Sequence, residues 1–93
     1  MHFYVYMILT KIHAKNVSYV GYTKNLKKRL SLHNSSKGAK FTKGKKWKII
    51  YSKRYKSRIK ALKEEYRLKK NYKLRKKIKN IYYINENFNL ITI

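Results

Sequence analysis

Apolar residues near the start of the chain recur at every second position, which is the period of a β-strand. A second apolar run, residues 17–22, follows the polar residues 11–16. The two runs predict a β-hairpin whose loop is longer than the tightest turns. In the first run, residues 2–10, one set of side chains alternates with the other: Phe3, Val5, Met7 and Leu9 with Tyr4, Tyr6 and Ile8.

A helical period replaces the strand period after this hairpin. Thr23 can cap a helix over residues 24–34, in which Leu26 and Leu30 lie four positions apart on one edge. Serine, glycine and lysine then interrupt the pattern over residues 35–46, which we call the basic loop. The sequence therefore predicts a short helix followed by an irregular, positively charged segment.

The second half of the chain predicts one more strand and two helical segments. Residues 47–55 read as a strand, and Ser57 can cap a helix over residues 58–71, so the order is ββαβα. A basic helical stretch, residues 72–79, precedes a tail, residues 80–93, that has no Lys or Arg and several apolar residues. We expect the tail to pack on the domain or extend it. Because there is no proline and no internal repeat, no second domain is expected.

The balance of charge favours a polyanionic partner. Lys and Arg number 26 against 3 acidic residues, which gives a formal net charge of +23. Nucleic acid is the leading partner, although ribosomal RNA or an anionic membrane surface would satisfy the same charge. The absence of cysteine excludes disulfides, thiolate nucleophiles and Cys-ligated zinc. The apolar run 3–9 is too short to span a bilayer and lacks the features of a signal peptide, so we expect a cytoplasmic protein, nucleoid-associated if prokaryotic.

The few carboxylates limit the metal chemistry. Besides the C-terminus there are only three, on Glu64, Glu65 and Glu86, so at most one metal ion is expected. On a helical wheel Glu65 falls near the middle of a broad apolar face, whereas Glu64 turns toward basic neighbours. The predicted apolar face consists of Ile59, Ala61, Leu62, Tyr66, Leu68 and Tyr72.

A core-facing carboxylate requires a compensating partner. For Glu65 this partner is either a divalent metal ion or a salt bridge to Lys69 or Arg58, and the helix alone does not distinguish the two. Arg29 and His33 share a face of the first helix at i, i+4 spacing, and they suit phosphate binding and proton transfer. A surface cation and a solvated histidine would look the same in the sequence, and His2 and His13 are expected to be surface residues.

Two of the ten tyrosines are candidates for chemistry. Tyr6 and Tyr19 lie on the two strands of the predicted hairpin, where their side chains can share a face. A phenol has a pKa of about 10 and can serve as a base only if cations or a metal lower that pKa. Arg29 is one cation that can do so. The other tyrosines, such as Tyr51, Tyr55 and Tyr82, are expected to be core residues.

The basic loop superficially resembles a nucleotide-binding P-loop, but five residues rather than four separate Gly38 from Gly44, and no Ser or Thr follows Lys45. We therefore expect no nucleotide cofactor. A flexible basic strap that contacts the nucleic-acid backbone is the better interpretation. The lysines assigned to such contacts are Lys24, Lys28, Lys37, Lys40, Lys43, Lys45 and Lys46.

These residues also fall into a known pattern. The chain resembles the GIY-YIG endonuclease superfamily, and in particular its small stand-alone domain proteins, over roughly residues 3–70. Two positions depart from the pattern: Tyr4 replaces the Gly of GIY, and Tyr22 stands where repair relatives carry a Lys. The matching segments are Tyr4-Val5-Tyr6, Tyr19-Val20-Gly21, residues 23–30, His33-Asn34, residues 37–42 and residues 61–65.

The resemblance implies an α+β domain over residues 1–79, in which helices flank a three-stranded antiparallel sheet. It further implies a metal-dependent DNA endonuclease that hydrolyses a phosphodiester with one Mg²⁺ or Mn²⁺ ion. The implied roles are water deprotonation for Tyr6, positioning for Tyr19, charge stabilisation for Arg29, proton transfer for His33 and metal binding for Glu65.

The substrate is expected to be duplex or branched DNA, with specificity supplied by DNA shape or by a protein partner. A role in repair or recombination would follow from selectivity for branched DNA. The alternative function is a non-catalytic, basic nucleic-acid-binding module on the same fold, which the net charge favours equally. No segment has the length and amphipathic character expected of a membrane-surface helix.

Overall fold

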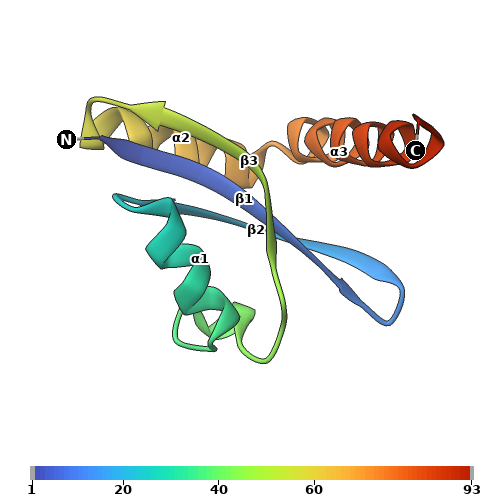
Figure 1. Ribbon diagram of the computed structural model, residues 1–93. Helices are drawn as coiled ribbons and strands as arrows, with labels where there is room; N and C mark the ends of the chain where they lie inside the picture. Colours follow the sequence, from blue (N-terminus) through green and yellow to red (C-terminus); the bar gives the residue numbers. More distant parts are fainter. Residues whose placement is uncertain (1, 93) are drawn as a thin grey trace.

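The computed structural model describes the backbone of residues 2–92 and the side chains of residues 2–86. Three strands form one antiparallel sheet in the order β2-β1-β3, and helices lie on both of its faces (Figure 1). This arrangement confirms the predicted α+β class and the three-stranded antiparallel sheet. The elements are β1 (Phe3–Ile12), β2 (Lys15–Thr23), α1 (Leu26–Asn34), the short 3-10 helix η1 (Lys40–Thr42), β3 (Lys48–Tyr55), α2 (Arg58–Lys70) and α3 (Tyr72–Thr92).

The hairpin between β1 and β2 is tighter than its sequence indicates. Only His13 and Ala14 form the turn, and the register pairs Ile12 with Lys15. Both turn residues have positive φ, 49° and 65°, which is the geometry of the two-residue turns that match strand twist. The predicted longer loop is therefore wrong, because the polar residues beside the turn extend the ladder through backbone hydrogen bonds.

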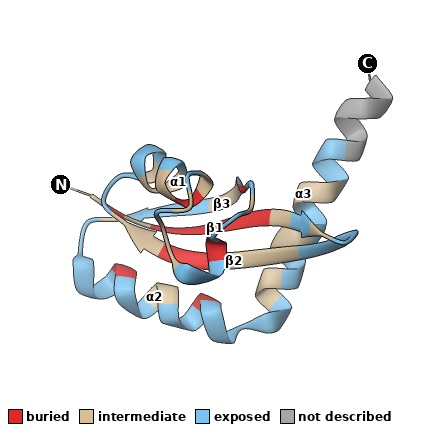
Figure 2. Ribbon diagram, turned by 90° about the horizontal axis from the view of Figure 1, so that it is seen from below, coloured by how far each residue is buried: buried red, intermediate tan, exposed pale blue. Residues whose placement is uncertain are grey.

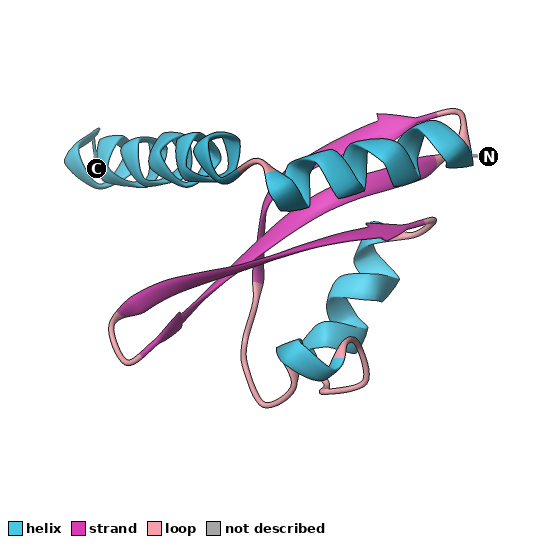
Figure 3. Cartoon of the chain, turned by 180° about the vertical axis from the view of Figure 1, so that it is seen from behind, coloured by secondary structure: helices cyan, strands magenta, loops and turns pink. Residues whose placement is uncertain are grey.

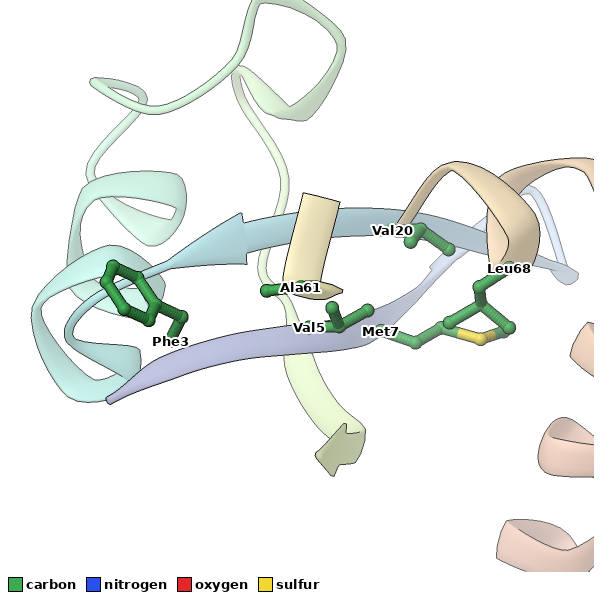
Figure 4. Packing of buried hydrophobic residues seen from close by; sticks show 6 residues of the cluster. All are labelled: Phe3, Val5, Met7, Val20, Ala61 and Leu68. Atoms are coloured by element: carbon green, nitrogen blue, oxygen red, sulfur yellow. The ribbon is translucent and has the colours of Figure 1, made fainter. Parts of the chain in front are cut away.

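The central strand β1 is covered on both faces. Helix α2 lies on one face, whereas α1 and the basic loop lie on the other (Figure 3). The cluster toward α1 is built on Tyr6, Ile8 and Trp47. Burial on both faces explains why β1 alternates two sets of large side chains rather than apolar with polar ones. The cluster toward α2 consists of Phe3, Val5, Met7, Val20, Ala61 and Leu68 (Figure 4).

Helix α2 presents a narrower apolar face than its sequence predicts. It begins after Ser57, whose side chain accepts a hydrogen bond from the Lys60 amide, as expected of an N-cap. Only Ala61 and Leu68 are buried, and other residues of the predicted face are exposed (Figure 2). The exposed fractions are 68% for Ile59, 38% for Leu62, 60% for Tyr66 and 65% for Tyr72. The predicted broad face is wrong because the helix contacts the sheet along a single stripe.

Helix α3 runs without a break from Tyr72 through residue 80, and it projects away from the sheet (Figures 1 and 2). Its first turns contact the domain, since Leu74 and Ile78 pack against the α2 cluster. Farther along, Ile81 and Ile84 are half or more exposed. The division at residues 79/80 stays a prediction, and the tail's side chains from residue 87 onward lie outside the described part. Within residues 2–92, no helix is long and apolar enough to cross a bilayer.

Candidate active site

Tyr6 of β1 reaches across the neighbouring strand because Gly21 leaves room for its ring. The two residues are paired in the β1–β2 register. A Cβ atom on Gly21 would lie 2.3 Å from the Tyr6 hydroxyl oxygen and 2.4 Å from the ring carbon that carries it. Any side chain at this position would therefore displace the phenol. The backbone approach at Gly21 thus determines where the Tyr6 hydroxyl lies.

A buried chain of hydrogen bonds starts at this hydroxyl. The Tyr6 oxygen lies 2.7 Å from His33 Nε2, and His33 Nδ1 lies 2.8 Å from the Thr42 hydroxyl oxygen. The Thr42 hydroxyl donates to the Ala39 carbonyl at 2.8 Å, so it can only accept from His33. His33 Nδ1 then carries the proton, and Nε2 accepts from the Tyr6 hydroxyl. The chain orients a neutral imidazole with its basic nitrogen toward Tyr6.

Burial shifts the pKa values of both titrating members of this chain. Desolvation lowers the pKa of His33, and the nearby Arg29 charge lowers it further, so the imidazole is neutral at pH 7. Desolvation raises the pKa of Tyr6 above 10.0; Arg29 opposes this increase, while Tyr19 and Glu65 add to it. Arg29 alone therefore does not lower the pKa of Tyr6 below its usual value, because burial outweighs the effect of the cation. Tyr6 needs an acceptor for its proton, and His33 Nε2 is that acceptor.

The basic loop is folded against α1 rather than extended. Its 3-10 helix places Thr42 at 0% exposure, and the Trp47 indole donates to the Thr42 carbonyl at 3.0 Å. The Asn34 amide bridges the loop's end, accepting from the Trp47 amide at 2.7 Å and donating to its carbonyl at 3.2 Å. A Cβ on Gly38 would lie 2.4 Å from His33 Nδ1, so a glycine is required there. The basic loop therefore forms part of the site, and the expectation of a flexible strap is wrong.

Tyr19 and Arg29 border this hydrogen-bonded chain. The rings of Tyr19 and His33 are 5.3 Å apart at their centroids in an edge-on arrangement. Arg29 on α1 lies close enough to influence the pKa of both Tyr6 and His33, and it lines an open hollow of about 580 Å³. That hollow is also lined by Lys24 and Arg58 together with Tyr22 and Thr23. A cationic hollow beside a phenol and a neutral imidazole suits a phosphate group.

Glu64 and Glu65 are nearly equally buried, with side chains 21% and 19% exposed. Glu64 pairs with Lys60 and Arg67, as the wheel predicted, at 3.9 and 3.6 Å. It nevertheless sits against the sheet: burial raises the pKa of Tyr51 on β3, and the charge of Glu64 adds to this increase, so Glu64 is not simply solvated. Glu65 acts on the other side, where its charge bears on Tyr6. The charges of the two carboxylates thus affect different residues of the sheet, Glu64 acting on Tyr51 and Glu65 on Tyr6.

Glu65 has the salt bridge that was one of its two expected partners. Its Oε1 lies 3.8 Å from the Lys69 ammonium, whose side chain is 48% exposed and can move away. Among the described side chains, no three metal-binding groups gather in one place. One carboxylate suits Mg²⁺ or Mn²⁺ only where substrate phosphate and water complete the coordination, which is how Mg²⁺ commonly binds. Glu65 is partly exposed, and its one salt-bridge partner is a mobile lysine, so its carboxylate fits such an ion.

The lysines assigned to nucleic-acid contacts are mostly free to make them. Six of the seven are exposed: Lys24, Lys28, Lys37, Lys40, Lys43 and Lys46. Lys45 differs, because its ammonium donates to the Phe41 and Lys43 carbonyls and lies 5.5 Å from the centre of the Phe41 ring. The exposed six lie on α1, on the residue before its cap and along the basic loop, on the side of the sheet that carries Tyr6.

Sequence reasoning gave no role to four residues that shape the site: Gly21, Gly38, Asn34 and Thr42. Gly21 had a usable signal, since a glycine inside a strand often marks close approach by another group. The other three had none, because their functions depend on contacts between α1 and a loop that only the folded chain brings together. All four nevertheless fall within the segments that carry the family resemblance.

Sequence comparisons with known proteins identify the family of the chain. A UPF0213 protein of Oceanobacillus iheyensis is 44% identical over 52 residues, which is 55% of this chain and 60% of that protein. UPF0213 proteins of Staphylococcus haemolyticus and Staphylococcus saprophyticus are 37% and 34% identical over 71% and 84% of this chain, and over 78% and 92% of their own lengths. No solved structure matches the chain. The family model of the GIY-YIG catalytic domain matches residues 2–84, and the chain therefore belongs to the GIY-YIG family.

Proposed function

We propose that this protein is a metal-dependent DNA endonuclease that hydrolyses a phosphodiester bond at the Tyr6–His33 site. The observation that carries the proposal is the buried chain from Tyr6 through His33 to Thr42, which presents a neutral imidazole nitrogen to the Tyr6 hydroxyl. A buried hydroxyl needs a hydrogen-bond partner in any case, and here the partner is a basic nitrogen that can also accept the proton. The family of the chain supports nuclease activity, and the net charge of +23 supports a nucleic-acid substrate.

In the proposed mechanism, Tyr6 takes the proton of the attacking water as its own proton passes to His33 Nε2. This relay avoids a free phenolate, which burial of Tyr6 makes unfavourable at neutral pH. Thr42 holds the proton on His33 Nδ1 and so keeps Nε2 ready to accept. Tyr19 positions the water or the phosphate beside the His33 ring.

Arg29 and Glu65 would stabilise the negative charge that builds on the phosphate during cleavage. Arg29 lies beside Tyr6 and lines the cationic hollow, so its guanidinium can hold the phosphate oxygens as negative charge builds on them. Glu65 would hold one Mg²⁺ or Mn²⁺ ion, with Lys69 released to the DNA backbone. Such an ion supplies neutralisation of the phosphate and of the leaving oxygen.

The test compares Glu65→Gln with Glu64→Gln, which gives a matched control on the next residue with similar exposure. Labelled duplex, single-stranded and branched DNA are incubated with Mg²⁺, Mn²⁺ or EDTA. We expect metal-dependent cutting by the wild type and by Glu64→Gln, and a loss of about 100-fold or more in Glu65→Gln, since metal stabilisation of the transition state amounts to several kcal/mol. Undiminished cutting by Glu65→Gln would show that the metal-holding role is wrong.

The alternative is a nucleic-acid-binding module without catalysis, which the net charge of +23 favours. It predicts tight binding whose logarithm falls linearly with the logarithm of salt concentration, without cutting in any metal. Glu65→Gln would then bind DNA as well as the wild type or slightly better, because it removes a negative charge. The same DNA panel therefore separates the two functions.

A further inference from the structure

An exposed aromatic residue stands at the end of a row of rings that starts inside the site. The Tyr19 ring packs on His33 with centroids 5.3 Å apart, and Phe41 stacks on Tyr19 at 6.2 Å with an interplanar angle of 18°. Phe41 is 52% exposed, although the next residue in the chain, Thr42, is 0% exposed. The row therefore leads from the Tyr6–His33 pair to solvent and ends in an apolar ring.

The ring of Phe41 is held in place although it is exposed. It belongs to η1, whose position depends on the Thr42 contacts to His33 and Trp47. The Phe41 and Trp47 rings are also 6.2 Å apart at their centroids. A fixed aromatic ring loses little conformational freedom when a second ring stacks on it, which favours binding. This distinguishes Phe41 from an apolar side chain that is exposed by chance.

Beside Phe41 lies a hollow that is lined by groups suited to a nucleotide. Its volume is about 340 Å³, and Tyr19 and Phe41 form its aromatic part. Lys69 and Arg75 supply two cations, and Arg75 is anchored by hydrogen bonds to the Leu68 and Lys69 carbonyls. The Lys45 ammonium lies over the Phe41 ring, 5.5 Å from its centre, and is held there by the Phe41 and Lys43 carbonyls. Aromatic faces that stack on bases, combined with cations that hold phosphates, are how proteins grip unpaired nucleotides.

A base inside a duplex cannot present its face to Phe41, since both faces are already stacked on neighbouring bases. An unpaired base can, at a cost that is smallest where the strand is already single. We propose that Phe41 stacks on an unpaired nucleobase next to the phosphate that is cut, so that the substrate is DNA with an unpaired nucleotide at that point, such as a flap or fork. This inference deepens the proposed nuclease function and rests on it for the position of the cut.

The test measures binding in EDTA, where no cutting occurs, with a fluorescently labelled flap, the matching single strand and the plain duplex. We expect Phe41→Ala to weaken binding of the flap and the single strand by about 5- to 100-fold, the range for loss of one base stack, and to leave duplex binding unchanged. Phe41→Trp should retain the preference, whereas Phe41→Leu, apolar but unable to stack, should resemble Phe41→Ala.

Tyr66→Ala is the matched control. Tyr66 is also an exposed aromatic residue with a lysine over its ring, Lys70 at 4.7 Å, but it lies outside the hollow beside Tyr19. We expect this variant to bind all three DNAs like the wild type. Equal losses for the three DNAs in Phe41→Ala, or no loss, would overturn the inference, as would a loss of the same size in Tyr66→Ala.

The outcomes for the inference and for the nuclease function can be told apart by adding Mg²⁺ or Mn²⁺ to the same samples. Cutting that depends on Glu65 but is equally fast in wild type and Phe41→Ala, with equal binding, would overturn the role of Phe41 and leave the nuclease standing. Phe41-dependent binding of unpaired DNA without cutting in either metal would support stacking, while it would overturn the nuclease and the position of the cut.

Discussion

The two faces of β1 are buried to a similar extent but by different chemistry. Toward α2, Val5 and Met7 meet Ala61 and Leu68, and the buried side chains of this cluster are all apolar. Toward α1, the ring of Tyr6 is 2% exposed and His33 and Thr42 are fully buried, so polar atoms enter the interior. Apolar packing tolerates many arrangements of similar volume, whereas a buried polar atom needs its partner at one distance and angle.

This difference assigns separate tasks to the two faces. The α2 face supplies free energy of folding, since all of its buried side chains are apolar and are removed from water. The α1 face uses part of that stability to hold a polar chain in one protonation state. Variants on the α2 face should therefore change the free energy of unfolding with little effect on the cleavage rate. Variants on the α1 face should mainly change the cleavage rate.

The largest expected effect is that of Tyr6→Phe on cleavage. Removing the hydroxyl ends the proton transfer to His33 Nε2, so the single-turnover cleavage rate should fall by about 10²- to 10⁴-fold. The free energy of unfolding should fall by only about 1–3 kcal/mol, the cost of a buried nitrogen without a partner. Tyr4→Phe on the same strand is the control and should change neither quantity strongly. Cutting by Tyr6→Phe at the wild-type rate would remove Tyr6 from the chemistry.

Leu68→Ala should have the opposite profile. Leu68 is 4% exposed at the centre of the α2 face, and its truncation should lower the free energy of unfolding by about 2–5 kcal/mol in denaturant titrations. The cleavage rate of the folded fraction should stay near that of the wild type. Leu62→Ala on the same helix, 38% exposed, should cost less. A Leu68→Ala protein that folds well but has lost cleavage would break the proposed division between the faces.

Thr42→Val tests whether the polar chain depends on its last side chain. Valine keeps the shape but removes the acceptor of His33 Nδ1 and the donor to the Ala39 carbonyl. We expect unfolding to become easier by about 1–3 kcal/mol. We also expect cleavage to slow by about tenfold, equivalent to about 1.4 kcal/mol. Nitrogen NMR of the His33 ring should show a mixture of tautomers in this variant and a single tautomer in Thr42→Ser. Identical spectra for the two variants would contradict the role of the hydroxyl.

The smallest effect is expected from pH. The pKa of His33 in the folded protein lies below its usual value of 6.5, so Nε2 can accept a proton throughout neutral pH. The cleavage rate should therefore fall only as pH decreases through this lowered pKa. Stability should decline as pH decreases from about 6.5 to this lowered pKa, because in that range the unfolded chain binds a proton that the folded chain does not. Tyr6, whose pKa is raised, should cause no loss below about pH 10. A rate that already falls between pH 8 and 7 would contradict a buried, neutral His33.

Local patterns predicted the elements of the fold well. The alternation in β1, the Ser57 cap of α2 and the order ββαβα are all present, because strand period and capping depend on residues near one another in the chain. The predicted Thr23 cap of α1 is wrong, because Asn25 caps this helix and its side chain accepts from the Lys28 amide. Two further predictions failed where distant contacts decide. The hairpin turn is shorter than its polar sequence implied, and the broad apolar face of α2 does not exist, since a wheel cannot tell how closely a helix approaches a sheet.

The candidate site likewise has features that the sequence predicts and features that depend on contacts between distant segments. Residue types and motif spacing singled out Tyr6, Tyr19, Arg29, His33 and Glu65, and their functional roles stay predictions until the variants are measured. The sequence by itself determined the charge, the number of carboxylates and the family of the chain. Only the tertiary structure decided that Tyr6 donates to His33 and that Thr42 selects the tautomer of His33. It also decided that burial raises the pKa of Tyr6 more than Arg29 lowers it. Each of these depends on distances between segments far apart in the chain, and hydrogen bonding and desolvation change steeply with such distances.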